Sequence, residues 1–319
     1  MKVLVTGGTG FIGSHLVRRL VLEDTEVHLF ARPESDLGRI EELIPKLVVW
    51  RGDVTDLGSI ERCVAKAQPE MVFHLAGDTS GRRWSRDLSE LDSSVQVNLG
   101  GTLNMLRVLQ SAARPPMRFI RAGGLAEYGE APVPFDERQR EMPVSAYGVS
   151  QAATTMFLSA LSSQLTFPVV TLRFAAVYGP GRAEDFFLPS LIVRCLSGED
   201  FEMTTGEQPW DLVYVDDAVD ALIRSTTAAI ESGEIMNIGS GRGPTLREIA
   251  ELVVRKIGSG RLRVGAVPVV AGDVPRLYCR NDKAKAVLGW QPRVDLDAGL
   301  ERTIAWYRER LTRKGGKIT

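Results

Sequence analysis

Apolar and polar positions alternate with two different periods along the first half of the chain. Apolar residues recur at helical spacing at Ile12, Leu16 and Leu20, and longer helices are predicted over residues 98–112 and 147–165. Short apolar runs of strand length separate the helical segments, at residues 3–5, 27–30, 47–50, 71–75, 119–122 and 169–174. Strands that alternate with amphipathic helices are typical of a parallel sheet covered on both faces.

The pattern changes after residue 175. A turn cluster, Tyr178-Gly179-Pro180-Gly181, precedes short strands and helical segments at residues 188–196, 216–228, 246–257 and 300–311. We therefore predict an α/β fold, with a Rossmann-type doubly wound parallel sheet over residues 1–175 and a smaller C-terminal α/β substrate-binding domain over residues 176–319. The second domain is expected to close a cleft over the first and to be interleaved with it near their boundary.

Composition and charge are typical of a soluble globular enzyme. Hydrophobic residues make up 44% of the 319 residues and charged residues 25%. The formal net charge of -1 gives no overall attraction to nucleic acid or an anionic membrane, and no apolar run reaches the roughly 18 residues of a membrane helix. Three cysteines without CxxC spacing argue against a disulfide framework or a zinc cluster. We expect a cytoplasmic protein that acts on a small molecule, without a metal, nucleic acid or membrane as partner.

A glycine-rich turn follows the first predicted strand directly. Gly7 permits a tight turn, Gly10 lets backbone N–H groups approach a pyrophosphate, and Gly13 allows the next helix to pack closely on the strand. The anion then lies at the positive end of the helix, beside Phe11 and Ile12. A purely structural turn is the alternative, but the strand-turn-helix context favours a dinucleotide site.

The end of the second strand bears on which dinucleotide binds. An NAD site normally carries an acidic residue there, which accepts hydrogen bonds from the ribose hydroxyls. This chain has Ala31 at that place, followed by Arg32, whose guanidinium can bind the 2′-phosphate of NADP. The alternative is that Arg32 is a solvated loop residue. We therefore expect NADP as the cofactor, with NAD as the second choice.

Two later strand ends carry residues that we expect beside the cofactor, with plain loops as the alternative. Asp53 and Val54 follow the third strand, where a carboxylate can accept a hydrogen bond from the adenine amino group. Leu75, Ala76 and Gly77 follow the fourth strand, in a small-residue turn that can pass close to the cofactor.

Taken together, these residues resemble the extended short-chain dehydrogenase/reductase superfamily, the group of NAD(P)-dependent nucleotide-sugar epimerases, dehydratases and reductases. The resemblance covers nearly the whole chain, and the matching motifs stand in order at residues 7–13, 53, 74–77, 98, 128–129, 147–148, 172–174, 178–181, 215–217, 237–241 and 288–290. It implies an NAD(P)-dependent enzyme and places Asn98 among the cofactor contacts. It also implies a homodimer formed through the helices at 98–112 and 147–165.

The catalytic pattern that the resemblance implies is only partly matched. The family has a tyrosine that relays a proton, a lysine four residues later that holds the nicotinamide ribose and lowers the pKa of the tyrosine, and a serine or threonine that binds the substrate oxygen. Tyr147 matches the tyrosine, whereas Gln151 and Gly124 stand in the other two places. Gln151 can still hydrogen-bond the ribose, but it carries no charge to stabilise a phenolate.

Substrate-binding positions depart from the family as well. Where the family often places an asparagine and an arginine on the nucleotide diphosphate, this chain has Ala176 and Trp210. Arg82, Arg83 and Arg121 are candidates to replace the lysine. We expect the substrate site to include Ala176, Trp210, Arg82, Arg83 and Arg276, with Arg173, Arg182 and Arg280 as further candidates for a diphosphate clamp.

Three functions follow from these observations. The first and favoured one is an NAD(P)-dependent epimerase or ketoreductase that acts on a nucleotide-linked sugar or a related hydroxy or keto metabolite, with Tyr147 as proton relay. The second is a repurposed family member with non-standard chemistry on a less charged, non-nucleotide metabolite. The third is a non-catalytic NADP-binding protein. A dehydratase is disfavoured, because Leu125 and Ala126 stand where those enzymes carry an acidic pair.

Overall fold

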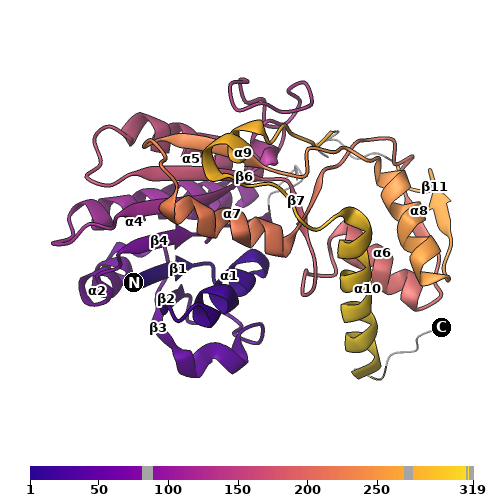
Figure 1. Cartoon of the computed structure of the whole chain (residues 1–319), viewed down its shortest axis with the longest axis horizontal. Helices are drawn as coiled ribbons and strands as arrows, with labels where there is room; N and C mark the ends of the chain where they lie inside the picture. The colour runs from indigo at the N-terminus through magenta and orange to yellow at the C-terminus, as the bar shows by residue number, and fades with distance from the viewer. Residues whose placement is uncertain (81–88, 269–275, 314, 316–319) are drawn as a thin grey trace.

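The structure is a computed structural model, and it describes residues 1–80, 89–268, 276–313 and 315. Seven parallel strands form a central sheet in the order β10-β6-β5-β4-β1-β2-β3 (Figure 1). The strands are β1 (Lys2–Thr6), β2 (Glu26–Ala31), β3 (Leu47–Arg51), β4 (Met71–His74), β5 (Arg118–Gly124), β6 (Val169–Phe174) and β10 (Glu234–Ile238). The strand order reverses at β1, so the predicted Rossmann-type, doubly wound fold is confirmed.

Helices cover both faces of this sheet. The helices of the first half are α1 (Phe11–Leu22), α2 (Leu57–Ala67), α3 (Ser89–Ser94), α4 (Gly101–Gln110) and α5 (Ala146–Leu161), with short 3-10 turns η1 (Glu41–Lys46) and η4 (Leu125–Glu127). Side chains of β1 alternate between two buried layers. Leu4 packs in the layer of α2, α4 and α5, whereas Val3 and Val5 pack in the layer of α1. The two-residue period of a strand therefore determines which of its side chains enter each layer.

The predicted helix at 98–112 begins earlier than expected and changes its winding. It is composed of α3, a π-helical segment η3 (Val95–Gly100) and α4. Its polar start, residues 89–94, carries no apolar periodicity, which explains why the sequence pattern did not include it. The predicted helix at 147–165 is α5, which ends at Leu161 and begins after Ser145, whose side chain accepts a hydrogen bond from the Gly148 N–H.

Beyond residue 175 the chain forms five helices and several short strands in the described residues. The helices are α6 (Phe187–Leu196), α7 (Val215–Thr227), α8 (Leu246–Ile257), α9 (Asp282–Leu288) and α10 (Leu296–Arg313). The short parallel pairs are β7 (Ala176–Tyr178) with β9 (Leu212–Tyr214) and β8 (Phe201–Met203) with β11 (Leu262–Val264). The four helical segments predicted here correspond to α6, α7, α8 and α10.

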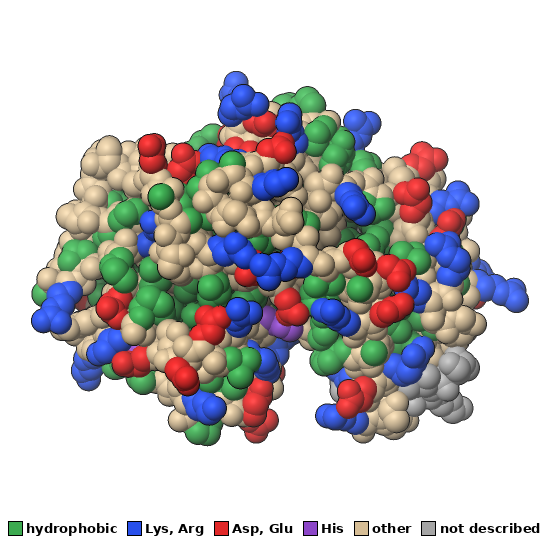
Figure 2. Space-filling model, viewed as in Figure 1, with side chains coloured by type: hydrophobic (Ala, Val, Ile, Leu, Met, Phe, Trp, Pro, Cys, Tyr) green, Lys and Arg blue, Asp and Glu red, His purple; other side chains and the backbone are tan. Residues whose placement is uncertain are grey.

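Two elements that follow residue 175 belong to the part of the molecule that contains the central sheet. α7 packs against α1, and β10 pairs with β6 at the edge of the sheet. The sequence pattern missed β10, because Glu234 and Asn237 interrupt its apolar run. α6, α8 and α10 pack together in a separate lobe, and Figure 2 shows a notch open between this lobe and the part that contains α1. The chain therefore crosses between the two parts more than once after residue 175.

Within the described residues, none of the helices has the length and apolar character needed to cross a membrane.

Candidate active site

The glycine-rich turn forms a tight loop between β1 and α1. Gly7 adopts a φ of +69°, and a Cβ on Gly13 would lie 2.1 Å from the carbonyl oxygen of Gly7, so neither position accepts a side chain. Gly10 precedes α1 and supplies no side-chain cap. The first N–H groups of the helix, at Phe11, Ile12 and Gly13, are therefore free to bind an external anion. The loop fits the pyrophosphate of a dinucleotide.

The turn after β4 is held against this loop by a buried histidine. Thr6 Oγ1 lies 2.9 Å from His74 Nδ1 and accepts a hydrogen bond from the Ala76 N–H at 3.1 Å. His74 Nε2 lies 3.1 Å from Thr102 Oγ1 on α4. Complete burial, with a smaller contribution from Arg121, lowers the pKa of His74 to about 3. A neutral His74 thus links β1, β4 and α4 and positions residues 75–77.

Asn98 and Gln151 converge on Gly77. A Cβ on Gly77 would lie 3.1 Å from Asn98 Oδ1 and 3.8 Å from Gln151 Nε2. Asn98, in the π-helical segment, accepts a hydrogen bond from the Asp78 N–H at 2.7 Å and donates one to Ser150 Oγ at 2.8 Å. Asn98 thus lies in a π-helical segment, a feature that is frequent at functional sites.

The ends of β2 and β3 carry two exposed arginines. Arg32 is 61% exposed and lies 3.3 Å from Glu34 in an ion pair. Arg51, which the sequence analysis did not single out, donates a hydrogen bond to the carbonyl oxygen of Arg32 at 2.9 Å. Next to them, Asp53 accepts hydrogen bonds from the N–H and Oγ1 of Thr55, and Val54 is buried. Two guanidinium groups thus lie at this edge of the sheet.

Tyr147, in the first turn of α5, faces Gly124 at the end of β5. A Cβ on Gly124 would lie 3.4 Å from the Tyr147 hydroxyl oxygen. Both residues line a cavity of about 590 Å³, which reaches from the sheet to the C-terminal lobe. The structure therefore brings together the tyrosine and the position that carries a hydroxyl in the resembling family.

Gln151 lies one turn beyond Tyr147 and is 5% exposed. Its Oε1 accepts a hydrogen bond from Nη2 of Arg121, a residue of β5 that is itself 2% exposed. Arg121 lies 3.7 Å from the buried Glu127, which also binds Arg173 at 2.6 Å. Burial lowers the pKa of Arg121, and the charges of Glu127 and Tyr147 oppose this shift.

The far wall of the cavity is mainly apolar and aromatic. Ala176 and Trp210 line it, as expected, together with Phe174, Phe186, Phe187, Phe201, Met203 and Leu246. Arg182 also lines the cavity, and its guanidinium lies 3.6 Å from the ring centre of Phe186 and 5.0 Å from that of Phe11. This arginine therefore lies between the start of α1 and the cavity.

The other predicted cations lie elsewhere or outside the described residues. Arg173 is fully buried and binds Glu127 and Glu141, so it cannot serve as a diphosphate clamp. Arg276 is exposed, and Arg280 pairs with Asp282. Arg82 and Arg83 lie outside the described residues.

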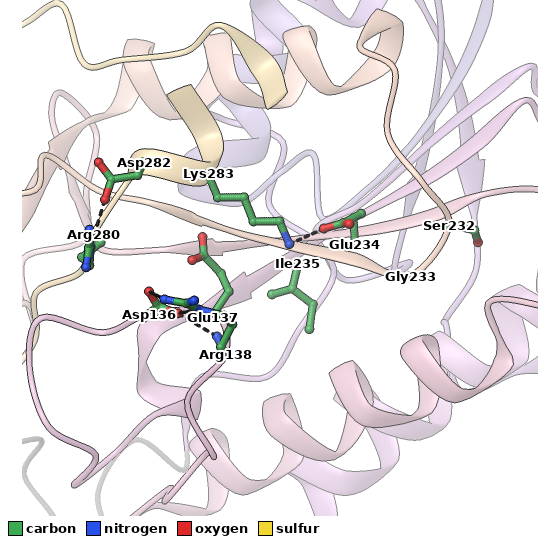
Figure 3. Close-up of a pocket in the computed structure, with 10 residues that line it drawn as sticks. All are labelled: Asp136, Glu137, Arg138, Ser232, Gly233, Glu234, Ile235, Arg280, Asp282 and Lys283. Carbon is green, nitrogen blue, oxygen red and sulfur yellow. Dashed lines mark hydrogen bonds and ion pairs between the residues drawn. The ribbon is translucent and has the colours of Figure 1, made fainter. Parts of the chain in front are cut away.

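A second hollow, of about 500 Å³, lies between the start of β10 and the start of α9 (Figure 3). Six of its charged side chains pair with one another: Lys283 with Glu234, Arg280 with Asp282, and Arg138 with Asp136. Glu137 instead accepts a hydrogen bond from the Asn237 N–H. Its lining shares no residue with the cavity of Tyr147. We therefore place the candidate active site in the cavity of Tyr147.

Comparison with known proteins agrees with this geometry. The sequence profile of the NAD dependent epimerase/dehydratase family matches residues 3–239. The chain belongs to this family. It is therefore an enzyme of the extended short-chain dehydrogenase/reductase type, as the motifs predicted. The match spans both the glycine-rich loop and Tyr147.

Individual members of the family are similar to this chain over nearly their whole length. The UDP-glucose 4-epimerase of Mycolicibacterium smegmatis is 29% identical over 320 residues, which cover 97% of this chain and 99% of the relative. The dTDP-glucose 4,6-dehydratase of Haemophilus influenzae is 29% identical over 335 residues, covering 96% and 98%.

Solved structures are also similar to this chain over nearly its whole length. The UDP-glucose 4-epimerase of Thermotoga maritima with UDP-glucose gives a TM-score of 0.87 at 28% identity, covering 98% of this chain and 100% of that one. The UDP-glucose 4-epimerase of Thermus thermophilus in complex with NAD gives 0.85 at 28% identity, covering 97% and 99%.

Proposed function

We propose that the protein is an NAD(P)-dependent epimerase or ketoreductase that acts on a hydroxyl or keto group of a nucleotide-linked sugar, with Tyr147 as the proton relay. The observation that carries this proposal is the place of the Tyr147 hydroxyl, beside Gly124 in a cavity whose lining residue Arg182 lies 5.0 Å from the ring centre of Phe11 at the start of α1. Relatives that include UDP-glucose 4-epimerases support the substrate class.

The chemistry divides between the coenzyme and the chain. A nicotinamide coenzyme accepts or returns a hydride at the reacting carbon. The Tyr147 phenol holds the proton of the reacting hydroxyl and returns it when the group is re-formed. Gly124 adds no hydroxyl of its own, so the phenol is the proton-transferring group in this part of the cavity. The aromatic wall gives the reacting centre an apolar boundary on one side.

Arg182 and Trp210 are the proposed substrate contacts on the side of the C-terminal lobe. Arg182 lines the cavity near the cofactor loop, where a guanidinium can bind phosphate oxygens in a bidentate manner. Trp210 and Phe201 offer flat apolar surfaces for a base or a sugar ring. Ala176 leaves space beside them, and Arg276, which is exposed and whose neighbour Leu277 lines the cavity, is a further candidate.

The aromatic wall also favours a second candidate function, in which the substrate is a less charged metabolite without a nucleotide. The two candidates differ in how UDP behaves. Competitive inhibition by UDP against the substrate supports a nucleotide-linked sugar. A turnover rate that added UDP does not change supports the second candidate.

NADP is the proposed coenzyme. Arg32 and Arg51 supply positive charge at the ends of β2 and β3, and Ala31 supplies no carboxylate that would repel a 2′-phosphate. The ion pair of Arg32 with Glu34 is solvent-exposed and hence weak, so it is easily exchanged for a phosphate contact. Neighbouring structures contain NAD, which stays the alternative coenzyme.

A homodimer is the proposed assembly. α5 exposes Val149, Met156 and Phe157 on one face, and the adjacent π-helical segment exposes Val95. Such a cluster of apolar side chains on neighbouring helices is typical of an isologous interface.

All three cysteines are buried and unpaired, which agrees with the proposed cytoplasmic location.

Replacement of Tyr147 tests the proposed catalytic role. In Tyr147→Phe the ring stays and the transferable proton is lost, so kcat on the nucleotide sugar should fall about 100-fold or more. Binding of the coenzyme, measured by fluorescence titration, should change little. Tyr278→Phe is the matched control, because its ring packs against Gly243 and its hydroxyl has no proposed role. Full turnover by Tyr147→Phe would refute the assignment.

A further inference from the structure

The active site lacks a cation on α5. Gln151 occupies the place one helical turn after Tyr147, where a positive charge would stabilise the ionised phenol. Two charged groups bond to α5 from beneath, on β5 and the turn that follows it. These are Arg121 and Glu127, both almost completely buried.

Arg121 is bonded to α5 at three points. Its Nη2 donates to Gln151 Oε1 and, at 3.2 Å, to the carbonyl oxygen of Gln151. Its Nη1 donates to Thr155 Oγ1 at 2.7 Å. A guanidinium on a strand is thus fixed directly behind the helix face that carries Gln151.

These contacts determine how the Gln151 amide is oriented. A guanidinium has only donors, so the amide atom that faces Arg121 must be the oxygen. Nε2 is then directed away from Arg121, toward Gly77 and Asn98, where a Cβ on Gly77 would lie 3.8 Å from it. The turn at Gly77 is a proposed cofactor contact. Gln151 therefore presents an N–H₂ group to the cofactor side of the site, with its carbonyl polarised by a buried charge.

The counter-ion of Arg121 is shared with another arginine. Glu127 Oε2 accepts hydrogen bonds from Arg173 Nε at 2.6 Å and from Thr155 Oγ1 at 2.8 Å, whereas Glu127 Oε1 lies 3.7 Å from Arg121 Nη1. Arg173 is thus the closer partner of Glu127. Part of the positive field of Arg121 is left to act on Gln151 and on Tyr147, with which it interacts electrostatically.

We propose that Arg121 and Gln151 together replace the absent lysine. Gln151 binds the nicotinamide ribose through Nε2. Arg121 is a positioning residue that fixes the amide in this orientation and supplies, from beneath the helix, the charge that stabilises ionised Tyr147. The inference rests on the proposed role of Tyr147 as the proton relay.

The pH dependence of kcat/KM in the holoenzyme tests this role. When the phenol must be ionised, the rate rises with pH along an ascending limb. Arg121→Met removes the charge, so the midpoint of the ascending limb should move to a higher pH by about one unit or more. At pH values below this midpoint, kcat/KM should fall about tenfold. Activity should recover at higher pH. Arg121→Lys keeps a charge and should retain a limb close to that of the wild type.

A further variant keeps the test decisive if Arg121→Met folds poorly. Gln151→Met leaves the ion pairs of Glu127 and the charge of Arg121 in place, and it should weaken coenzyme binding because the Nε2 donor is lost. The double variant Arg121→Met/Gln151→Lys places a cation on α5 and should return the limb toward lower pH. Arg118→Met is the matched control on β5, since its contacts with the carbonyl oxygens of Ser225 and Ala228 lie away from the site.

An unchanged pH profile in folded Arg121→Met, or undiminished coenzyme binding by folded Gln151→Met, would overturn the inference. This outcome differs from failure of the proposed function itself, in which Tyr147→Phe keeps full turnover. An inactive Tyr147→Phe together with either of these results would contradict only the role of Arg121 and Gln151.

Discussion

At the residue scale, the absence of a side chain at Gly124 determines how much space lies beside the Tyr147 hydroxyl. The Gly124 backbone is extended, with φ -149° and ψ 155°, and a Cβ there would meet the hydroxyl at an ordinary contact distance of 3.4 Å. The fold therefore does not require glycine at this position. The missing side chain enlarges the cavity beside the phenol, and Ala176 on β7, which lines the same cavity, is small as well.

Arg32 makes the coenzyme preference testable at the same scale. Arg32→Ala removes a guanidinium that can bind the 2′-phosphate, so the Kd for NADP should rise about tenfold or more, and the Kd for NAD should change little. Both constants can be measured by titration of the protein fluorescence. Arg19→Ala, an exposed arginine on α1, serves as the control. Tighter binding of NAD than of NADP by the wild type would contradict the proposal.

At the element scale, the parallel strands were the most predictable part of the fold. The apolar runs of β1, β2, β4, β5 and β6 are buried on both faces, so each can be recognised without its neighbours. The edge strand β3 is only partly buried. The contact between Arg121 and Gln151 was not predictable, because it joins β5 and α5 across 30 residues and depends on how the helix packs. The π-helical segment around Asn98 likewise has no signature in the apolar pattern.

His74 connects three elements and gives the fold a pH dependence. Its pKa is lowered from 6.5 to about 3, so the unfolded chain binds a proton that the folded chain excludes. Stability should fall as the pH falls from 6.5 toward 3, by about 2 kcal/mol at pH 5. His74→Asn should have a flatter dependence between pH 7 and pH 5, although it loses a hydrogen bond.

Urea denaturation at several pH values measures this difference. Burial raises the pKa of Asp211 to about 6, so its contribution runs in the opposite direction, toward higher stability at low pH. Comparison of the variant with the wild type cancels that contribution. Equal slopes in the two proteins would show that His74 does not exclude the proton.

At the scale of the whole molecule, the turn at residues 178–181 joins the two parts beside the site. The Pro180 carbonyl oxygen lies 3.0 Å from His15 Nε2 on α1, and the Gly181 carbonyl oxygen accepts a hydrogen bond from Arg39 at 3.3 Å. Tyr307 of α10 donates a hydrogen bond to the Arg182 carbonyl oxygen. The position of Arg182 in the cavity therefore depends on both parts of the chain, which sequence periodicity alone does not reveal.

The apolar face of α5 makes a prediction about assembly. The wild type should have a mass in solution of twice the 35.0 kDa of one chain, measured by light scattering after size-exclusion chromatography. Phe157→Asp places a charge in the proposed interface and should shift the protein toward the monomer. Leu22→Asp alters an apolar side chain on α1 that is 74% exposed and should leave the mass unchanged. A monomeric wild type would contradict the proposed homodimer.

A crystal structure of the complex with NADP and a UDP-linked sugar tests the central claim most directly. We expect the pyrophosphate at the N–H groups that open α1, and the reacting hydroxyl within hydrogen-bond distance of the Tyr147 phenol oxygen. A coenzyme bound away from the glycine-rich loop, or a sugar whose reacting carbon lies out of reach of Tyr147, would contradict the account.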